Sequence, residues 1–215
     1  MPAHRRSPRA IPTRTQTNRA AISQVRIIGG EYRRRQVGFV DADGLRPTPD
    51  RVRETLFNWL QDNITGVSVL DCCAGSGVLG FEALSRGARH VTMVEPNRAQ
   101  FGQLQATQQQ LAISDARLTL LPTTAEQALD GIPVRTLAPF GGVFLDPPYG
   151  LNLWQPLLRL LLDHALLAAD GWLYLESDRP HDTSLAPALA ALEPLKYKKM
   201  GHVFAGLYRL KDETM

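Results

Sequence analysis

The stretch VSVLDCCAGSGVLG, residues 67–80, contains a short apolar run, a glycine-rich turn and a second apolar run. The first run, Val67 to Asp71, is typical of a buried β-strand, and the glycines that follow end it. The second run predicts a helix over about residues 77–86. A strand that leads through a glycine-rich turn into a helix is the first unit of a nucleotide-binding α/β fold.

Strand and helix signals alternate along the chain after this unit. Further strands are expected at residues 91–95, 117–121, 142–145 and 172–176, with helices over about residues 97–111, 124–130, 152–168 and 184–192. Two last strand-like runs, 195–200 and 203–210, flank Gly201-His202, which can form a tight turn, so we expect them to pair antiparallel. The pattern predicts an α/β fold whose doubly wound sheet is mostly parallel and ends in a C-terminal antiparallel hairpin.

The residues before this alternation form shorter segments. The first 22 residues are rich in Arg, Pro, Thr and Ser, and they predict a disordered basic tail. Val25–Ile28 and Gln36–Val40 are strand-like and predict a small β-hairpin. Thr48-Pro49-Asp50 predicts a helix start, with Thr48 as the N-cap and a helix through residue 62. We therefore expect a tail over residues 1–22, a hairpin arm over 23–44 and the α/β domain over 45–212.

The charge of the chain is distributed unevenly. The net charge is +3, but residues 1–35 contain nine arginines and one acid, whereas the remainder contains 15 basic and 20 acidic residues. A basic arm on a mildly acidic body favours a polyanionic partner such as a nucleic acid. The alternative, a tail that only keeps the protein in solution, applies to residues 1–20 better than to Arg33-Arg34-Arg35, which lie between two strand-like runs.

Neither the cysteines nor the apolar runs indicate a secreted or membrane protein. Cys72 and Cys73 are adjacent, so they cannot form an ordinary loop-closing disulfide, and no metal-ligand spacing surrounds them. We expect both to be small buried residues. The longest leucine-rich stretch, residues 157–169, is short and interrupted by charged residues, and the N-terminus lacks the apolar core of a signal peptide. These features predict a cytoplasmic protein.

The glycine-rich turn allows two kinds of nucleotide ligand. Gly75, Gly77 and Gly80 satisfy the dinucleotide fingerprint, and Glu95 ends the next strand where a ribose-binding acid belongs, so an NAD-type site is admissible. Asp71 favours S-adenosylmethionine (SAM) instead. A carboxylate directly before the turn would repel a pyrophosphate, but it could meet the ammonium group of a methionine.

The loop Asp146-Pro147-Pro148-Tyr149 follows the strand predicted at residues 142–145 and decides between these ligands. Ligands of open α/β sheets bind at the carboxyl ends of the strands. The two prolines make the loop stiff and remove N–H donors, so the Asp146 carboxylate and the Pro147 carbonyl can hold the two N–H bonds of a planar amine. Tyr149 can stack on the ring that bears the amine, a contact worth about 1–3 kcal/mol. The loop predicts methyl transfer to an amino group, although Asp-Pro can also simply end a strand.

These motifs resemble those of the RsmD family, SAM-dependent methyltransferases that modify a guanine of small-subunit (16S) ribosomal RNA at N2. The resemblance extends from about residue 24 to 210 and is carried by residues 26–30, 45–48, 50–60, 71, 74–77, 82–86, 95 and 146–148. The segment at 46–60 is specific to this group, whereas the Asp-Pro-Pro-Tyr type of loop is shared by amino-methyltransferases of DNA, RNA and protein. The resemblance implies a Rossmann-like methyltransferase fold.

The resemblance also implies roles for individual residues. The catalytic loop would be Asp146, Pro147, Pro148 and Tyr149. SAM would be bound by Asp71, Ala74, Gly75, Ser76, Gly77, Glu95, Pro96, Thr124, Ala125 and Thr48, with Glu95 at the ribose hydroxyls and Thr48 near the methionine end. RNA phosphates would be bound by Arg26, Arg33, Arg34, Arg35, Arg46 and Arg51. The expected partner is small-subunit rRNA or the 30S particle, the expected state is a monomer, and the guanine must be unstacked to react.

Several alternatives remain open from the sequence. The same loop occurs in DNA adenine-N6 and protein glutamine-N5 methyltransferases, although a separate target-recognition domain of the DNA enzymes is not evident. An NAD-dependent oxidoreductase would need a hydride-transfer acid, and His90 and His164 are better interpreted as surface or satisfied helix residues. A non-catalytic RNA-binding protein would show no dependence on Asp146.

Overall fold

The computed structural model describes residues 21–41, 47–181 and 189–211. Its main strands are β3 (Ser68–Asp71), β4 (His90–Val94), β5 (Leu118–Leu121), β6 (Phe140–Leu145), β7 (Leu167–Ser177), β8 (Leu192–Met200) and β9 (Val203–Leu210). Its helices are α1 (Asp50–Trp59), α2 (Val78–Ser85), α3 (Arg98–Gln110), α4 (Ala125–Asp130), α5 (Ile132–Leu137) and α6 (Trp154–Asp163), with a 3₁₀ turn η1 (Tyr149–Leu151).

The main sheet has the order β5-β4-β3-β6-β7-β9-β8. The first five of these strands are parallel to one another, whereas β9 is antiparallel to both β7 and β8. From β3 the chain winds outward to β4 and β5, and it then returns to add β6 and β7 on the other side. The sheet is therefore doubly wound, as predicted, and its topological switch point lies between β3 and β6, where ligands of such sheets bind.

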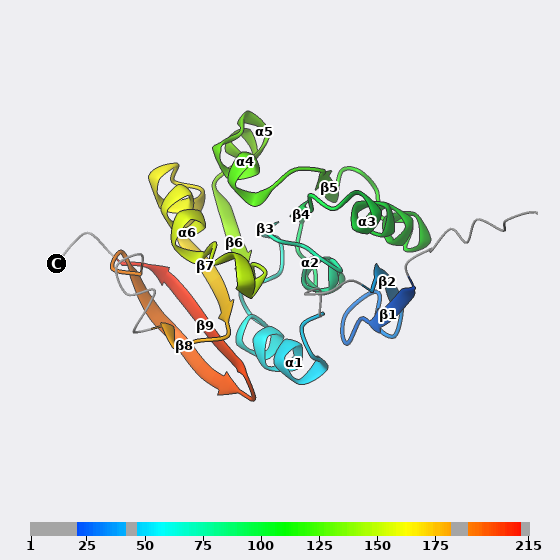
Figure 1. Cartoon of the computed structure of the whole chain (residues 1–215), viewed down its shortest axis with the longest axis horizontal. Coiled ribbons are helices and arrows are strands. Elements are labelled where there is room, and N and C mark those ends of the chain that lie inside the picture. Colours follow the sequence, from blue (N-terminus) through cyan, green and yellow to red (C-terminus); the bar gives the residue numbers. More distant parts are fainter. Residues whose placement is uncertain (1–20, 42–46, 182–188, 212–215) are drawn as a thin grey trace, which may run out of the picture.

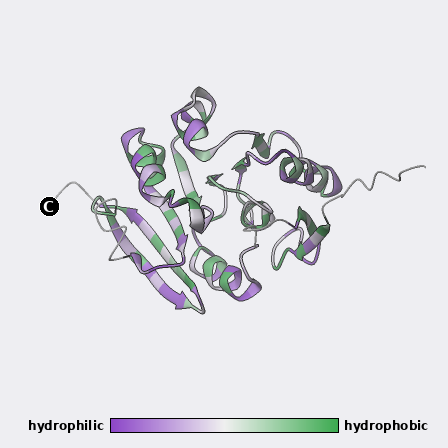
Figure 2. Ribbon diagram, viewed as in Figure 1, coloured by the Kyte–Doolittle hydropathy of each residue, from purple (hydrophilic) through white to green (hydrophobic). Residues whose placement is uncertain are grey.

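Helices cover both faces of this sheet (Figure 1), with α1 to α3 on one face and α4 to α6 on the other. Phe57, Phe81 and Phe144 belong to the core under α1 to α3, whereas Leu129 and Trp154 belong to the core under α4 to α6. Because the central parallel strands are buried on both faces, they are apolar runs without alternation. Figure 2 shows the resulting contrast between these green strands and the purple outer faces of the helices.

The N-terminal strands β1 (Ile22–Arg26) and β2 (Gln36–Val40) form a separate two-stranded antiparallel sheet, which confirms the predicted hairpin. The first strand lies three residues earlier than expected. The connecting segment docks on α2, because the N–H groups of Ile28 and Gly29 donate to the Glu82 carboxylate at 2.7 and 2.8 Å. Gly30 has a φ of +76°, and a Cβ there would collide with the carbonyl of Ser85, so this position requires glycine.

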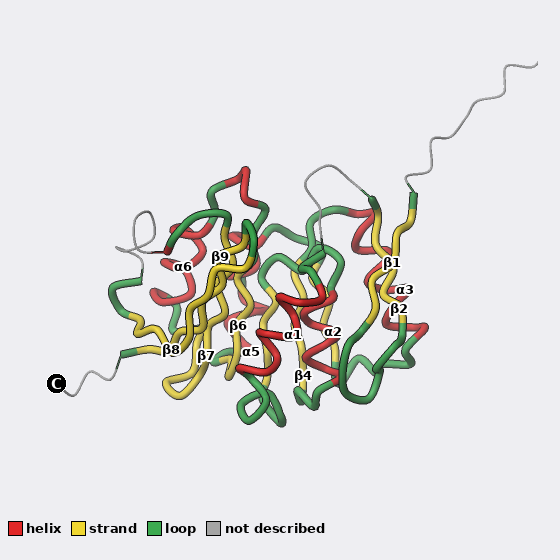
Figure 3. The backbone as a smooth tube through the Cα atoms, turned by 90° about the horizontal axis from the view of Figure 1, so that it is seen from below, coloured by secondary structure: helices red, strands yellow, loops and turns green. Residues whose placement is uncertain are grey.

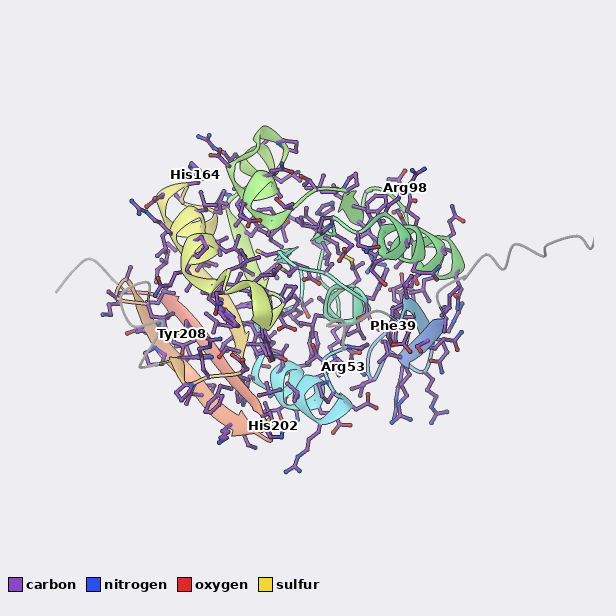
Figure 4. The ribbon with its side chains drawn as sticks, in the orientation of Figure 1. Phe39, Arg53, Arg98, His164, His202 and Tyr208 are labelled. Atoms are coloured by element: carbon purple, nitrogen blue, oxygen red, sulfur yellow. The ribbon has the colours of Figure 1, made fainter. Side chains whose placement is uncertain are left out.

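Arg53 connects the hairpin, α1 and α2. Its side chain is fully buried and lies between α1 and the hairpin (Figure 4). The guanidinium donates to the carbonyls of Arg26 and Thr48, both at 3.0 Å, and it pairs with Asp50 at 2.6 Å and Glu82 at 3.5 Å. A buried charge with this many acceptors is well compensated, so Arg53 fixes these three elements relative to one another.

Several element boundaries differ from the sequence expectations. Helix α1 ends at Trp59, and its N-cap is Pro49 without a side-chain cap bond, so Thr48 is not the cap. Helix α6 is shorter and β7 longer than expected, because Ala165, with a φ of +48°, ends the helical segment before β7. Helix α5 was not predicted, and its Pro133 lies in the first helical turn, where proline is tolerated.

The last predicted helix and the two cysteines complete this comparison. The helix expected over residues 184–192 falls mostly on residues 182–188, outside the described residues, and residues 189–191 form a turn before β8. The β8–β9 hairpin around Gly201-His202 is confirmed.

The two cysteines do not form a disulfide: Cys72 is buried and Cys73 half-buried, and both are free. Within the described ranges, no helix has both the length and the apolar character that a membrane span requires.

Candidate active site

Four carboxyl groups lie at the carboxyl ends of four adjacent parallel strands. Asp71 ends β3, Glu95 directly follows β4, Asp146 directly follows β6, and Glu176 is the penultimate residue of β7. We call these four residues the carboxyl cluster. Figure 3 shows the sheet from the side, with this edge at the top of the view. The cluster spans the topological switch point between β3 and β6.

The surroundings of the cluster make it hard to ionise. Burial raises the pKa of Asp71 to about 7, and burial also raises the pKa of Glu95 and of Glu176. The pKa of Asp146 lies well above its usual range because of burial first, and then because of the nearby carboxyls of Glu176 and Asp71. In the described part of the chain, no salt bridge includes any of the four. A cationic ligand would relieve this repulsion, and an anionic ligand would increase it.

Asp71 also has an atom that needs a partner. Its Oδ2 is buried and has no hydrogen-bond partner among the described residues. A buried polar atom without a partner costs about 1–3 kcal/mol. The atom lies beside Gly80 of α2, and the backbone N–H groups of Gly80 and Cys73 partly offset the effect of burial on the pKa of Asp71.

The glycine-rich turn uses its own N–H groups internally. The N–H of Ala74 donates to the Val94 carbonyl at 2.9 Å, and that of Gly75 donates to Glu95 Oε2 at 2.9 Å. The N–H of Gly77 donates to the Ala74 carbonyl at 2.6 Å, and that of Val78 to Ser76 Oγ at 3.3 Å. A dinucleotide site needs free N–H groups for the pyrophosphate. These four N–H groups are therefore already engaged within the protein and are not available to a pyrophosphate.

The glycines of the turn are also required by backbone conformation and packing. Gly75 and Gly77 have φ values of +50° and +75°, which favour glycine. A Cβ on Gly77 would collide with Phe81 and Leu104, and one on Gly80 would collide with Met93. At Gly77 and Gly80 the space that a side chain would need is therefore taken by the protein's own side chains.

The loop after β6 brings the predicted catalytic residues together. Thr48 is buried, and its hydroxyl donates to Asp146 Oδ2 in a long contact of 3.4 Å. Pro147 is buried and Pro148 is exposed. The Tyr149 ring lies 5.8 Å from that of Trp154 between centroids, tilted by 32°. This packing leaves the loop with few alternative conformations.

Glu176 is a site residue that the sequence motifs did not identify. Its carboxylate accepts hydrogen bonds from the hydroxyls of Tyr149 at 3.1 Å and Tyr174 at 2.7 Å, and its carbonyl accepts one from Trp154 Nε1 at 2.8 Å. Burial and the negative charge of Glu176 raise the pKa of Tyr149, so its hydroxyl remains a donor. The sequence did contain a signal for Glu176, because an acidic residue also occurs at the ends of the parallel strands β3, β4 and β6.

The other residues predicted to bind SAM also follow strands at this edge. Thr124 caps α4 by accepting a hydrogen bond from the Gln127 N–H at 3.3 Å, and Ala125 is buried in the first turn. Both follow β5, and Pro96 is exposed after β4. Ser76 is a buried residue of the glycine-rich turn itself. Thr124 and Ala125 therefore add a fifth strand end, that of β5, to the candidate site beside the carboxyl cluster.

The predicted RNA-binding arginines separate into distinct places. Arg51 is exposed in the first turn of α1, which begins near Asp146, whereas Arg46 lies outside the described residues. Arg26 pairs with Asp50 at 3.0 Å. The turn that contains Arg33, Arg34 and Arg35 is exposed, and it lies against the last residues of α2 and α3, where Tyr32 bonds to Ser85 and Arg35 to the Gln110 carbonyl.

This arginine turn is far from the carboxyl cluster. Helices α2 and α3 begin at the carboxyl edge of the sheet and run away from it, so their last residues lie at the opposite edge. The structure therefore does not bring Arg33, Arg34 and Arg35 next to Asp146. The two histidines considered for hydride transfer are engaged elsewhere: His90 bonds to Thr119 and His164 to Asp130, both at 3.0 Å.

Comparison with known proteins adds a family. Residues 25–209 match the family described as Conserved hypothetical protein 95. The chain is 40% identical over 192 residues to Ribosomal RNA small subunit methyltransferase D of Escherichia coli K12, which covers 89% of this chain and 93% of that protein. It is also 40% identical over 160 residues to the protein of the same name from Haemophilus influenzae, covering 74% and 81%.

Solved structures agree with these matches. The yhhF protein of Escherichia coli, described provisionally as a methyltransferase, superposes with a TM-score of 0.76 at 38% identity, covering 88% of this chain and 99% of that one. A Haemophilus influenzae protein described provisionally as a methylase has a TM-score of 0.69 at 35% identity, covering 88% and 100%. A more distant structure solved with S-adenosylhomocysteine (SAH), at 13% identity and a TM-score of 0.64, shares the fold.

Proposed function

Because the chain belongs to the RsmD family, the one described as Conserved hypothetical protein 95, we propose that it methylates the exocyclic N2 of a guanine in 16S rRNA. The reaction class follows from the family: the protein is a SAM-dependent methyltransferase that acts on small-subunit rRNA. The guanine N2 acceptor, and the 30S particle as the form of the substrate, are the finer parts of the proposal.

The observation that supports the proposal best is the unpaired carboxyl cluster. SAM carries a sulfonium and an ammonium group, and both positive charges suit a site with four carboxyls and no described cation. The charge of the Asp71 carboxylate attracts the ammonium group, and Glu95 has further lone pairs for ribose hydroxyls. The negatively charged pyrophosphate of NAD would be repelled here.

The loop after β6 supplies what an amine acceptor needs. When bound, SAM would provide a methyl group that its sulfonium has already activated. Asp146 and the Pro147 carbonyl can accept the two N–H bonds of a planar amine, which turns the nitrogen lone pair away from its ring. Asp146 stands between Thr48, which donates to it, and the carboxyls of Glu176 and Asp71, which raise its pKa. Catalysis is then mainly orientation and electrostatic stabilisation by this fixed carboxyl.

Tyr149 provides the surface on which the base can rest. Its hydroxyl is held by Glu176 and its ring is packed near Trp154, so the ring is fixed before the substrate arrives. A preorganised ring loses little entropy when a base stacks on it. An unstacked guanine on Tyr149 would present its amine to Asp146, the first residue of the same loop.

An assay of product identity tests this proposal. The protein is incubated with methyl-labelled SAM and 30S particles from cells that lack this methyltransferase, and in parallel with free 16S rRNA. We expect the label in N2-methylguanosine after digestion to nucleosides. Label in N6-methyladenosine alone, or in ribosomal protein alone, would refute the guanine assignment. Calorimetry with SAM and with NADH tests the cofactor separately.

SAM affinity is expected to fall as the pH falls below 7. The pKa of Asp71 is raised to about 7, so below that pH the carboxyl is increasingly protonated and no longer attracts an ammonium group. An α-amino group has a pKa of about 7.7–8.0, so below pH 7 the ligand is predominantly positive and only the carboxyl changes its charge. Calorimetry from pH 7 to pH 5 should show the affinity decreasing toward tenfold per pH unit at the acidic end.

The control for this prediction is Asp71→Asn, which keeps the size of the side chain but does not titrate. It should bind SAM more weakly at pH 8 and show a flatter pH profile, with only the contribution of neighbours such as Glu95 remaining. Equal slopes for the native protein and the variant would exclude Asp71 as the ammonium-binding group.

A further inference from the structure

The strand β8 presents a strip of basic and aromatic side chains at the edge of the sheet. The strip consists of Lys196, Tyr197, Lys198, Lys199 and His202, and all five are exposed. We propose that this lysine strip is a second RNA-binding surface, which holds the rRNA backbone on the β7 side of the active site. This inference rests on the proposed function, because it assigns a further contact with the same substrate.

The charge of the strip is not compensated locally. Residues 194–203 include three lysines and no acid. Among the described residues, no salt bridge includes Lys196, Lys198 or Lys199. The ammonium of Lys199 lies 5.0 Å from the centre of the Phe204 ring, a cation–π contact that leaves its charge available. The second half of β8 is accordingly purple in Figure 2.

The strand register places the strip beside the active site. Glu176 pairs with Ala205 of β9, and Ala205 pairs with Lys198 of β8. Strands lie about 4.8 Å apart, so the backbone of Lys198 is roughly 10 Å from that of Glu176. Lys199 is one step nearer the tip of the hairpin, where His202 is labelled in Figure 4. The lysines therefore lie at the same edge of the sheet as the carboxyl cluster.

The alternation of side chains gives the strip two kinds of contact. Lys196 and Lys198 point to one face of the sheet, whereas Tyr197 and Lys199 point to the other. Lysines bind phosphates without regard to base sequence, and an exposed aromatic ring can stack on an unpaired base. The Tyr197 ring makes an edge contact with the His181 ring, with centroids 5.0 Å apart, and the side chain is still 48% exposed. Lysines that alternate with an aromatic residue suit a single-stranded RNA segment.

The strip lies on the other side of the molecule from the hairpin. Figure 1 shows β8 at one end of the structure and the β1–β2 hairpin at the other, with α1 between them. The arginine turn of the hairpin lies at the edge opposite the carboxyl cluster, as described above. An RNA that reaches Asp146 therefore passes closer to the lysine strip than to Arg33, Arg34 and Arg35.

A simpler role of edge-strand lysines is to prevent pairing with a second copy of the chain. That role is needed along the whole exposed edge. The lysines are confined to residues 196–199, the part of β8 nearest the active site, whereas the first half of β8 is interrupted by Pro194 and the register shift that follows it. The two roles therefore call for lysines at the same positions, and the experiment below separates them.

The test compares the triple variant K196Q/K198Q/K199Q with a matched variant, R89Q/R135Q/R159Q. The matched variant also removes three positive charges from exposed side chains, which lie outside the active site and both proposed RNA surfaces. Binding of 16S rRNA is measured over a range of salt concentrations, together with KM for the particle, kcat and SAM affinity. The native protein must first bind rRNA and methylate particles, and its failure to do so would refute the proposed function itself.

We expect the strip variant to bind rRNA at least tenfold more weakly than the native protein. Its slope of log affinity against log salt should be smaller by about 2, since each phosphate contact on a single strand contributes about 0.7. Because rRNA binding is weaker, KM for the particle should rise, whereas SAM affinity should not change. The matched variant should resemble the native protein in all of these measurements. An unchanged affinity and salt slope in the strip variant would overturn the inference. So would self-association of that variant with native RNA affinity, which would indicate edge protection.

Discussion

Replacing Asp146 with alanine is expected to lower kcat for rRNA methylation by a factor of at least about 10²–10³, the usual effect of removing one electrostatic contact from a preorganised site. The carboxylate is the acceptor that we propose for one N–H bond of the amine, and Thr48 fixes it. Without it the amine keeps its planar, conjugated geometry and its lone pair is not directed at the methyl donor. The measurement is kcat with saturating SAM and 30S particles.

Stability and binding provide the controls for the Asp146→Ala variant. The pKa of Asp146 is raised, so its ionised form destabilises the folded protein, and its removal should leave the melting temperature unchanged or higher above neutral pH. Binding of rRNA should persist. Asp146→Asn, which keeps an acceptor oxygen, is expected to retain more activity than the alanine variant. Full methylation activity of the alanine variant would show that Asp146 does not contribute to catalysis.

Replacing Glu82 with alanine is expected to reduce the free energy of unfolding by about 3–5 kcal/mol, the usual cost of breaking a buried ion pair. The Glu82 side chain is fully buried. It accepts from the N–H groups of Ile28 and Gly29 and pairs with Arg53 and Arg86. The substitution leaves the guanidinium of Arg53 and two N–H groups with fewer acceptors, so both the hairpin and the core of α1 and α2 lose stability.

Thermal unfolding checks this prediction. For a chain of this size, a loss of this magnitude should lower the melting temperature by roughly 10 °C. Glu54→Ala is the matched control, because Glu54 is an exposed glutamate of α1 and its loss should change the melting temperature little. A Glu82→Ala variant that melts within 2 °C of the native protein would show that the other acceptors of Arg53 suffice.

The sequence was sufficient to predict those parts of the fold that local patterns determine. The apolar runs of β3, β4 and β6 are buried on both faces, so each stands out without alternation. Because parallel strands end at one edge, the acids after these strands could be grouped before their contacts were known. Asp71, Glu95 and Asp146 were identified in this way, and their proximity follows from the topology.

The sequence was insufficient where distant contacts determine a residue's role. The local sequence around Thr48 is typical of a helix N-cap, but the N-cap of α1 is Pro49. The Thr48 hydroxyl instead donates a hydrogen bond to Asp146, which is 98 residues away in the sequence. Glu176 belongs to no motif, and its importance depends on two tyrosines that reach it from β7 and from the loop after β6. The position of the arginine turn relative to the active site depends on how the hairpin packs against α2. The number of arginines in the sequence does not reveal that position.

The buried guanidinium of Arg53 has a consequence for how the enzyme selects its nucleotide. It joins the hairpin at Arg26 to the segment that carries Thr48, so these parts form one rigid unit with the edge where Asp146 lies. The separation between the hairpin and the amine-binding loop is then constant. Under the proposed function, an RNA bound by both would present the nucleotide that lies at this fixed distance from the phosphate on the hairpin. One guanine among many would then be selected by its position in the folded RNA, without contacts to the neighbouring bases.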